Sequence, residues 1–492
     1  MKNLFHYNAI ACGVILLAGS LAQAAPVYQP PGSNLVYGDV THGGRIQSAS
    51  SNPAAAAADL ARGSANARRG TVLSGAAGLE YGNVQNIFDF IDAVAAGYEP
   101  SDPGSGGGGP GQDPGDKPGG GIDIDEILDN LDPDFVSAVE AAVDEAARQA
   151  VILALIASEG YGKAWLAADA PFVMGSEHWG GAWTFGMNWS GGSKAFGLKD
   201  EIRFDFDDAL MRLEDWFNTL PLDRPVQFEL SDDVLMLVEP TTNALRIIID
   251  NDSSIVSKSS QLTEFNAGYS RQAWSNSAGN LYLGAEAKLY LMKLSRLSVR
   301  FGDITDSEEL FRAINDAEFS EDTRMGIDLG ALWVGNNYQL GAQITNVNEP
   351  NFEFPAVDLG PYSNLDFIDQ IQRDQSYKMN RQLKLEASLF STNGTWSTHL
   401  GIDANASTDP LGDDYQWATL SAGFRTESWW LPGARFGYRK NLAGTGLSYL
   451  GIGLTAFKIV NFDISSALET VEIDGTTLPR GLMASIGFQI TW

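Results

Sequence analysis

Cysteine is nearly absent: the chain of 492 residues has one, Cys12. It lies in an N-terminal segment that we expect to be removed on export, so the mature chain is predicted to have no cysteine. This excludes disulfides, thiolate metal sites and cysteine nucleophiles in the mature protein. It also suits an oxidising compartment, where a stray thiol is a liability.

Basic residues are few, with 32 Lys and Arg against 62 Asp and Glu and a net charge of −30. Such a chain repels phosphate backbones, so we expect no nucleic-acid partner. Adsorption to an anionic membrane surface is equally disfavoured. There are four histidines, and no HExxH, GxSxG or P-loop motif occurs. We therefore predict no enzyme, no catalytic residues, no metal site and no cofactor.

Long apolar runs are also missing. The longest after the N-terminus is Ala150 to Ala157, far short of the ~20 residues that a membrane-spanning helix needs. The N-terminus itself has Lys2, an apolar stretch and then Ala22-Gln23-Ala24, which predicts a signal peptide over residues 1–24. The alternative is an N-terminal helix of the mature fold. The mature chain is then soluble or a β-barrel, because such barrels hide their membrane-spanning segments in alternating strands.

Two segments interrupt the strand-like sequence. Residues 25–70 form an N-terminal segment in which Asn52, Pro53 and the following alanines predict a capped helix, in the periplasm or inside a barrel mouth. Residues 84–162 form an insertion: a Gly/Pro/Asp-rich linker followed by a helix from Asp132 to Gly160. Asp123 and Asp125 hint at calcium, but their spacing favours a solvated linker.

From residue 71 to residue 492, excluding the insertion, apolar residues recur with period two. In the stretch 281–291 every second residue is Leu or Ala, and the alternate set includes Glu286 and Lys288. The stretches 338–344 and 383–389 alternate in the same way. A strand separates two such faces, whereas a helix scatters them. We predict an all-β, transmembrane, antiparallel up-and-down β-barrel of 14–16 strands, in which two strands around Gln227 to Val256 are the least certain.

The last strand is the most informative. Leu482, Ala484 and Ile486 continue into Phe488, Ile490 and Trp492 on one face, and the chain ends on the aromatic residue. Exported barrels finish in this way, so Phe488, Ile490 and Trp492 are predicted to be the barrel-assembly signal. The expected location is the cell outer membrane of a Gram-negative bacterium. The expected partners are outer-membrane lipid, the barrel-assembly machinery and proteins of a conjugation or envelope complex.

Turn lengths predict which end of the barrel is which. Short turns occur at Asn336-Asn337, Asn393-Gly394, 431–433 and 441–446, and long gaps at 302–321, 348–379 and 472–481. When the C-terminus is placed in the periplasm, the long gaps are predicted on the outer side and the tight turns on the inner side, as in outer-membrane barrels.

Tryptophan is frequent near the predicted strand ends, as expected for aromatic girdles at the membrane interfaces. The residues concerned are Trp179, Trp183, Trp189, Trp396, Trp429 and Trp430. The alternative is that they are ordinary core aromatics.

If the apolar faces meet lipid, the other faces line the lumen. The predicted lumen-lining residues are Glu264, Glu286, Lys288, Asp328, Lys384, Glu386, His399, Asp403, Arg425, Arg435, Arg439 and Asp463. Charges in a pore set its ion preference; the alternative is that these residues pair with one another and hold the wall. His399 and Ser397 share a face, as in barrel lipases, but no third residue to orient them is identifiable. His399 and Asp403 are ~13 Å apart along a strand, too far to share a metal.

Several stretches resemble known families. Ser51-Asn52-Pro53-Ala54 resembles the Asn-Pro-Ala signature of FadL-like transporters for fatty acids and aromatic hydrocarbons. The stretches 261–270 and 328–350 resemble TraF-type conjugal transfer proteins, and Arg435 to Leu454 is similar to both groups. The resemblance implies an outer-membrane barrel. It leaves open a conjugation or envelope role and a passive channel for hydrophobic or small solutes; a secreted β-sandwich is the non-membrane alternative.

Overall fold

The computed structural model describes residues 31–42, 46–62, 69–82, 160–176, 180–200, 212, 226–231, 233–239, 244–249, 251–303, 312–314, 316–373, 375–426, 428–473 and 476–492. The predicted signal peptide, the linker with Asp123 and Asp125, the helix from Asp132 and Trp179 lie outside the described residues. Among the described helices, none is long and apolar enough to cross a membrane.

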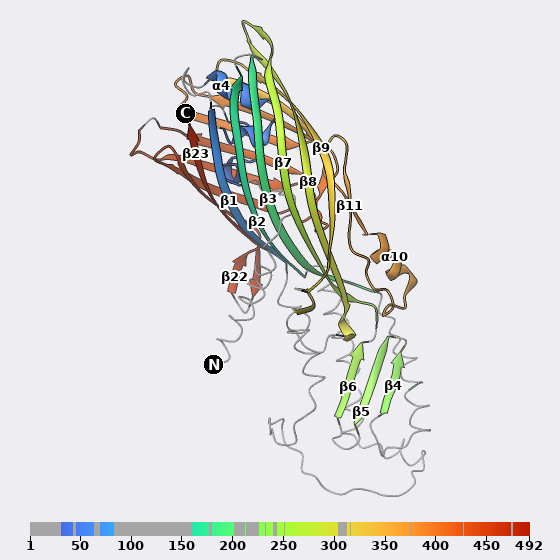
Figure 1. The fold of residues 1–492 in the computed structure, drawn as a ribbon. Coiled ribbons are helices and arrows are strands. Elements are labelled where there is room, and N and C mark those ends of the chain that lie inside the picture. The colour runs from blue at the N-terminus through green and yellow to red at the C-terminus, as the bar shows by residue number, and fades with distance from the viewer. Residues whose placement is uncertain are drawn as a thin grey trace, which may run out of the picture.

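Fourteen antiparallel strands close into one barrel (Figure 1). In ring order they are β1 (Arg69–Tyr81), β2 (Tyr161–Ser176), β3 (Gly181–Leu198), β7 (Ser254–Asn276), β8 (Gly279–Arg300), β9 (Phe319–Val334), β10 (Tyr338–Thr345), β13 (Gln382–Phe390), β14 (Trp396–Asp403), β17 (Trp417–Phe424), β18 (Gly433–Asn441), β19 (Ser448–Ala456), β20 (Val460–Ala467) and β23 (Gly481–Thr491).

Each strand pairs with the next barrel strand along the chain, and the first strand closes the ring against the last. Gly70 pairs with Thr491 and Glu80 with Gly481 across β1 and β23. The up-and-down barrel is therefore confirmed, with fourteen strands. The uncertain segment forms a separate three-stranded sheet of β4 (Val226–Ser231), β5 (Val234–Glu239) and β6 (Ala244–Ile249), and β7 begins directly after it.

The barrel wall is apolar outside and polar inside. In β14, Leu400 and Ile402 are exposed whereas His399 and Asp403 are buried. In β23, Leu482, Ile486, Phe488 and Ile490 are exposed. In a soluble protein this pattern would be inverted, because apolar side chains leave water. An outward apolar band is the surface that lipid covers in outer-membrane barrels.

The two ends of the barrel differ as predicted, with one correction. The connections 277–278, 335–337, 391–395 and 457–459 are short and lie at the end where β23 finishes, whereas the segments 301–318, 346–381 and 468–480 lie at the other end. The turn at 441–446 was predicted on the inner side; it joins β18 to β19 at the long-loop end, because β18 runs away from the end where β23 finishes. We refer to the long-loop end as the outer end.

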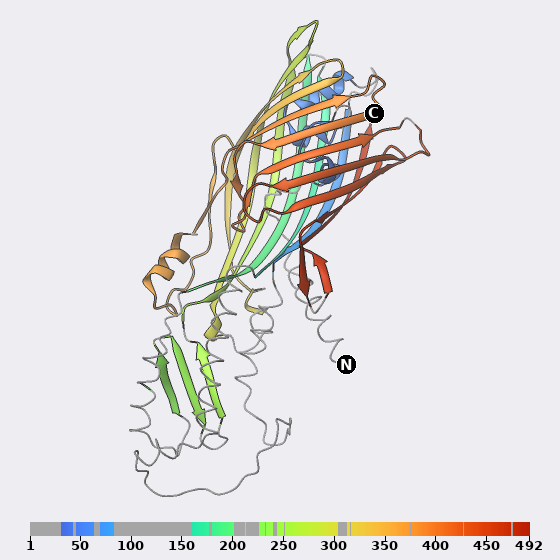
Figure 2. The ribbon, with the colours of Figure 1, turned by 180° about the vertical axis from the view of Figure 1, so that it is seen from behind.

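The barrel wall is much taller on one side. β7 has 23 residues and β8 has 22, against 8 in β14 and 8 in β20. Figures 1 and 2, seen from opposite sides, show the long green strands projecting beyond the short orange and red ones. The segment with β11 (Asn351–Glu353), α10 (Leu365–Arg373) and β12 (Ser376–Lys378) packs along this tall wall.

The described N-terminal residues lie inside the barrel. We call residues 33–62 the plug; it contains α2 (Asn34–Tyr37), α3 (Ser48–Ser51) and α4 (Ala55–Arg62). α2 contacts β17 to β20, and α4 contacts β2, β3, β7, β8 and β9. The predicted cap is present, since the Asn52 Oδ1 accepts a hydrogen bond from the Ala54 N–H at 2.9 Å. The sequence left two locations open for this helix, the periplasm and the mouth of the barrel, and the structure places it inside the barrel.

Candidate functional site

Glycines of the barrel wall make room for the plug backbone. A Cβ atom on Gly284 would lie 2.2 Å from the carbonyl oxygen of Pro53, and one on Gly437 would lie 2.0 Å from that of Val36. At Gly330 it would lie 2.1 Å from the Asn52 Oδ1. Any larger residue at these positions would collide with the plug, so the wall and the plug fit each other at backbone level.

Polar side chains hold the plug at mid-height. The Thr41 backbone N–H donates to Glu386 Oε2 at 2.5 Å, and the Thr41 hydroxyl also donates to Glu386. Gln47 Nε2 and Ser50 Oγ donate to Asp169 Oδ2, both at 2.9 Å. Lys384 forms an ion pair with Asp39. These contacts join the plug to walls on both sides of the lumen.

One wall carries a compact charge cluster across β7, β8 and β9. The Lys288 Nζ lies 3.2 Å from Glu264 Oε1 and 3.0 Å from Asp328 Oδ2, and Glu286 is 3.9 Å away. The register explains the cluster, because Glu286 and Asp328 are direct cross-strand partners. Four of the predicted lumen-lining residues therefore meet at one point. Their arrangement fits the interpretation in which the lumen charges pair with one another and hold the wall.

The opposite wall carries a second set of predicted residues. Arg435 Nε and Nη2 bind Asp463 at 2.6 and 2.7 Å, with both side chains almost fully buried. The Arg439 guanidinium lies 4.3 Å from the centre of the Trp417 ring, and Asp403 Oδ2 accepts a hydrogen bond from the backbone N–H of Trp417 at 2.8 Å.

Arg425 is placed differently from the other predicted lumen residues. It follows the last residue of β17, and its side chain is exposed at the inner end. Period two put it on the lumen face, but the strand stops before reaching it.

His399 is packed between the wall and the plug. Its Nδ1 lies 2.8 Å from Ser388 Oγ and its Nε2 lies 2.9 Å from Ser397 Oγ. Its ring stacks edge-on against Tyr37 of the plug. Because hydroxyls occupy both ring nitrogens, this histidine is a buried contact in the seam between wall and plug. Among the residues described, no three His, Cys, Asp or Glu side chains are arranged to hold a metal ion.

A cavity of about 210 Å³ remains between the plug and the walls. Asn34, Asp39 and Val40 line it from the plug. The walls contribute, among others, Asp169, Asn188, Glu264, Lys288, Asp328, Lys384, Asp403, Trp417 and Arg439. The cavity is therefore surrounded by charge on all sides and is the best candidate for a ligand site in the described part of the chain.

Above the cavity, a loop at the outer end closes over two lysines. The loop carries β15 (Ser407–Thr408) and β16 (Asp414–Tyr415). Lys163 Nζ lies 2.5 Å from Asp409 Oδ2 and 2.8 Å from Asp413 Oδ2, and Lys194 also pairs with Asp413. Burial raises the pKa of Asp413, but attraction to Lys163 and Lys194 outweighs it and brings the pKa to about 2.

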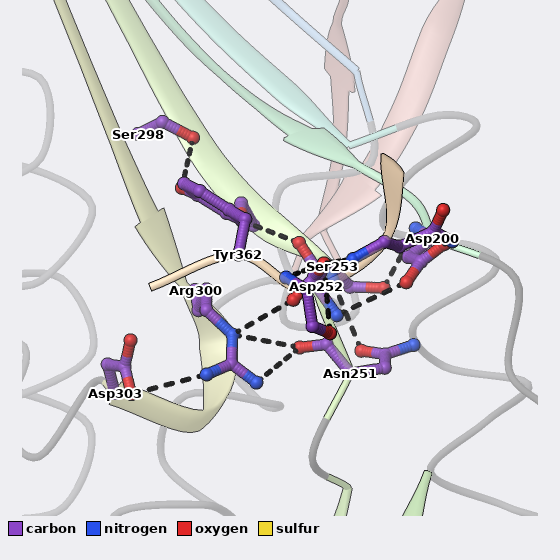
Figure 3. Close-up of polar contacts among 11 residues, drawn as sticks. Asp200, Asn251, Asp252, Ser253, Ser298, Arg300, Asp303 and Tyr362 are labelled. Atoms are coloured by element: carbon purple, nitrogen blue, oxygen red, sulfur yellow. Dashed lines mark hydrogen bonds and ion pairs between the residues drawn. The ribbon is translucent and has the colours of Figure 1, made fainter. Parts of the chain in front are cut away.

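A second polar cluster fastens the loop before α10 to the tall wall (Figure 3). Asp252 accepts backbone N–H bonds from Ser363 at 2.8 Å and Asn364 at 2.6 Å, and it lies 3.4 Å from Arg300 Nε. The Tyr362 hydroxyl donates to Ser298 Oγ at 2.8 Å. This cluster has a structural role: it joins β7, β8 and the outer loop.

Sequence reasoning missed several of these residues. Asp39 and Asp169, which join plug to wall, carried no signal, because the plug has no strand periodicity and Asp169 was not assigned to a face. Alternation along β2 would have identified Asp169, since it lies two residues from Ala167 on the buried face. The predicted girdle is present in part: Trp396, Trp429 and Trp430 are exposed near the inner end, whereas Trp189 packs against a buried cluster.

Comparison with known proteins identifies the family of the chain. The family described as "F plasmid transfer operon, TraF, protein" matches residues 49–403. No curated protein matches the chain. The chain is similar to the toluene transporter TodX of Pseudomonas putida, with 10% identity over 94% of this chain and 96% of that chain and a TM-score of 0.37.

Two further solved structures are similar. A TodX monoaromatic hydrocarbon channel deltaS2 mutant has 11% identity over 95% of this chain and 100% of that chain, with a TM-score of 0.42. A mutant of the Rh. blastica porin has 10% identity over 86% of this chain and 100% of that chain, with a TM-score of 0.23. Because the family match covers well over half of the chain, the protein belongs to the family described as "F plasmid transfer operon, TraF, protein", and its fold is a closed, fourteen-stranded antiparallel β-barrel.

Proposed function

We propose that the protein is an envelope transport barrel in which the plug closes the lumen and must move before a small solute can pass. The observation that carries this proposal is the plugged, charge-lined lumen with its cavity of about 210 Å³. Polar contacts hold the plug at this level, and water can replace them when the plug moves. The polar lining favours a small polar solute over a hydrophobic one.

A reversible tether between plug and wall tests the proposal. A Cβ atom on Gly401 would lie 2.6 Å from Val40 Cγ1, which is close to the place of a cysteine sulfur at residue 40. We therefore expect the double variant Val40→Cys/Gly401→Cys to form a disulfide, within the short reach that such bonds require. The two single variants are the matched controls, since neither can crosslink the plug.

The measurement is conductance in planar bilayers under oxidising and reducing conditions. Conductance of the double variant should be lost on oxidation and return on reduction, while the single variants respond to neither treatment. Equal conductance in both states of a crosslinked sample would show that the plug need not move. If neither the wild type nor a folded variant lacking residues 33–62 conducts, transport is to be abandoned.

A role in conjugation is the second candidate, favoured by the family description alone. In that case the outer loops or the inner turns would bind envelope proteins, and conduction would be incidental. Deleting the gene and measuring the frequency of plasmid transfer discriminates the two: a loss that the oxidisable double variant fully restores under oxidising conditions supports assembly over transport.

A further inference from the structure

The cavity presents hydrogen-bond acceptors that have no donor. Three Oδ1 atoms, those of Asn34, Asp169 and Asn188, are buried and have no hydrogen-bond partner among the residues described. Asn34 is 1% exposed and Asp169 is 4% exposed, and all three residues line the cavity. Buried acceptors are normally satisfied, so three at one cavity point to a missing donor.

Neighbouring contacts fix the direction of these acceptors. Asn34 Nδ2 donates to Ser51 Oγ at 2.8 Å, and Asn188 Nδ2 donates to Glu264 Oε1 at 3.0 Å. The other oxygen of Asp169 already accepts two hydrogen bonds from the plug. The three side chains therefore cannot turn away without breaking existing bonds, and their unpartnered oxygens are held in place for a ligand.

The electrostatics of this wall favour a cation. Asp169 on β2 lies on the same cavity wall as the cluster of Glu264, Glu286 and Asp328, in which Lys288 forms ion pairs with all three carboxylates. Four carboxylates thus share one ammonium group. A second positive charge placed at Asp169 would reduce their mutual repulsion, because attraction between charges is strong in a region with little water.

The size of the cavity favours an organic cation over a bare ion. A volume of about 210 Å³ exceeds the ~150 Å³ that admits a benzene ring in other proteins. We propose that the cavity binds a small organic cation, a protonated primary amine with roughly five to ten non-hydrogen atoms. A primary ammonium has three N–H donors, which match the oxygens of Asn34, Asp169 and Asn188. Binding of the amine does not depend on the proposed function. Only its biological role, as the class of solute that passes through the barrel, rests on that proposal.

The test is calorimetric titration of the folded full-length protein in detergent with three probes of matched length. n-Butylamine carries the charge, n-butanol is its neutral counterpart and butyrate is its anionic counterpart. We expect butylamine to bind, butanol to bind at least about tenfold more weakly, and butyrate not to bind. Equal binding of butylamine and butanol, or no binding of butylamine, would overturn the proposal and leave a cavity that holds water only.

Substitutions locate the ammonium. In Asp169→Asn the plug donors hold the amide oxygen at the Oδ2 position, so the NH₂ group faces the cavity and replaces an acceptor with a donor. We expect butylamine to bind roughly 30-fold more weakly, as when a buried charge pair loses one partner. Asn34→Asp adds a carboxylate and should tighten binding.

Asp414→Asn is the matched control, since it also removes one carboxylate but lies exposed in the loop with β15 and β16 and outside the cavity lining. It should change butylamine affinity by less than about threefold. If Asp414→Asn and Asp169→Asn weaken binding equally, the ammonium does not sit where we place it. The titration needs no transport, so binding without conduction would remove the proposed function alone, and conduction without binding would remove this inference alone.

Discussion

At the scale of single residues, cross-strand contacts such as those of Lys288 organise the barrel wall. Period two predicted Lys288 and Glu286 on the lumen face; Lys288 lines the cavity, and Glu286 is buried beside it. Their meeting with Asp328 depends on the register between β8 and β9, which the pattern of one strand does not contain. Arg425 shows the second limit, because alternation does not say where a strand ends.

Gly284 offers a test at this scale. The change Gly284→Ala puts a methyl group against the Pro53 carbonyl and Ala54 nitrogen, backbone atoms that cannot turn away. Overpacking of this kind costs about 1–3 kcal/mol, and displacement of the plug relieves it. We expect the labelling rate of a cysteine at the buried Ser51 to rise roughly tenfold, a factor that corresponds to about 1.4 kcal/mol.

The control is Gly75→Ala on β1, where the nearest atom to an added Cβ is 3.6 Å away. This variant should label at the rate of the parent with Ser51→Cys. Identical rates for both glycine variants would mean that the plug does not rest on the wall at Gly284.

At the scale of elements, strands were predictable because a lipid-facing wall imposes strict alternation over many residues. The plug was harder, since α2 and α3 have four residues each and such short helices leave no periodic pattern. The cap at Asn52 predicted a helix starting at Pro53, and α4 begins two residues later, at Ala55. Its location in the lumen follows from contacts with wall glycines more than two hundred residues away, which no local signal reports.

The loop with β15 and β16 should loosen in acid. Because the pKa of Asp413 is about 2, below the ordinary value of 3.8, its contribution to stability is complete above about pH 4 and is lost as the pH falls from 4 to 2. At pH 6, Asp413→Asn breaks buried pairs with Lys163 and Lys194 and should cost about 3 kcal/mol. The difference between wild type and variant should shrink towards pH 2.

Thermal unfolding in detergent, measured from pH 6 to pH 2.5, checks this expectation. Asp414→Asn is a suitable control, because Asp414 is exposed in the same loop. A difference for Asp413→Asn that stays constant down to pH 2.5 would show that its carboxylate is not what holds the loop.

At the scale of the whole molecule, the exposed side chains mark the membrane. On the outer face of β8 and β9 the apolar residues Leu289, Leu291 and Met325 give way to the ion pair of Lys293 with Glu321. Beyond this level β8 continues for several more residues, and the segment with α10 contacts it through Arg296 and Ser298, on the face opposite to Lys293. The tall wall therefore extends beyond the apolar band.

An arginine introduced into the outward apolar band of the wall tests whether lipid covers that band. Ile452, at the middle of β19, and Trp430, in an inner turn, are both exposed. In lipid vesicles Ile452→Arg should destabilise the barrel by about 2–4 kcal/mol and Trp430→Arg by about 1 kcal/mol or less. Urea unfolding gives both values, and equal small effects would indicate that lipid does not cover this face.

Ring closure between β1 and β23 also sets a condition on biosynthesis. The segments that complete the wall are made at opposite times, since β1 emerges early and Gly481–Thr491 emerges last. Until then β1 and β20 both have open edges, which are prone to pair with other chains. A product lacking β23 has no strand to pair with both β1 and β20, so only a chain that includes residues 481–491 can enclose residues 33–62 in this closed ring.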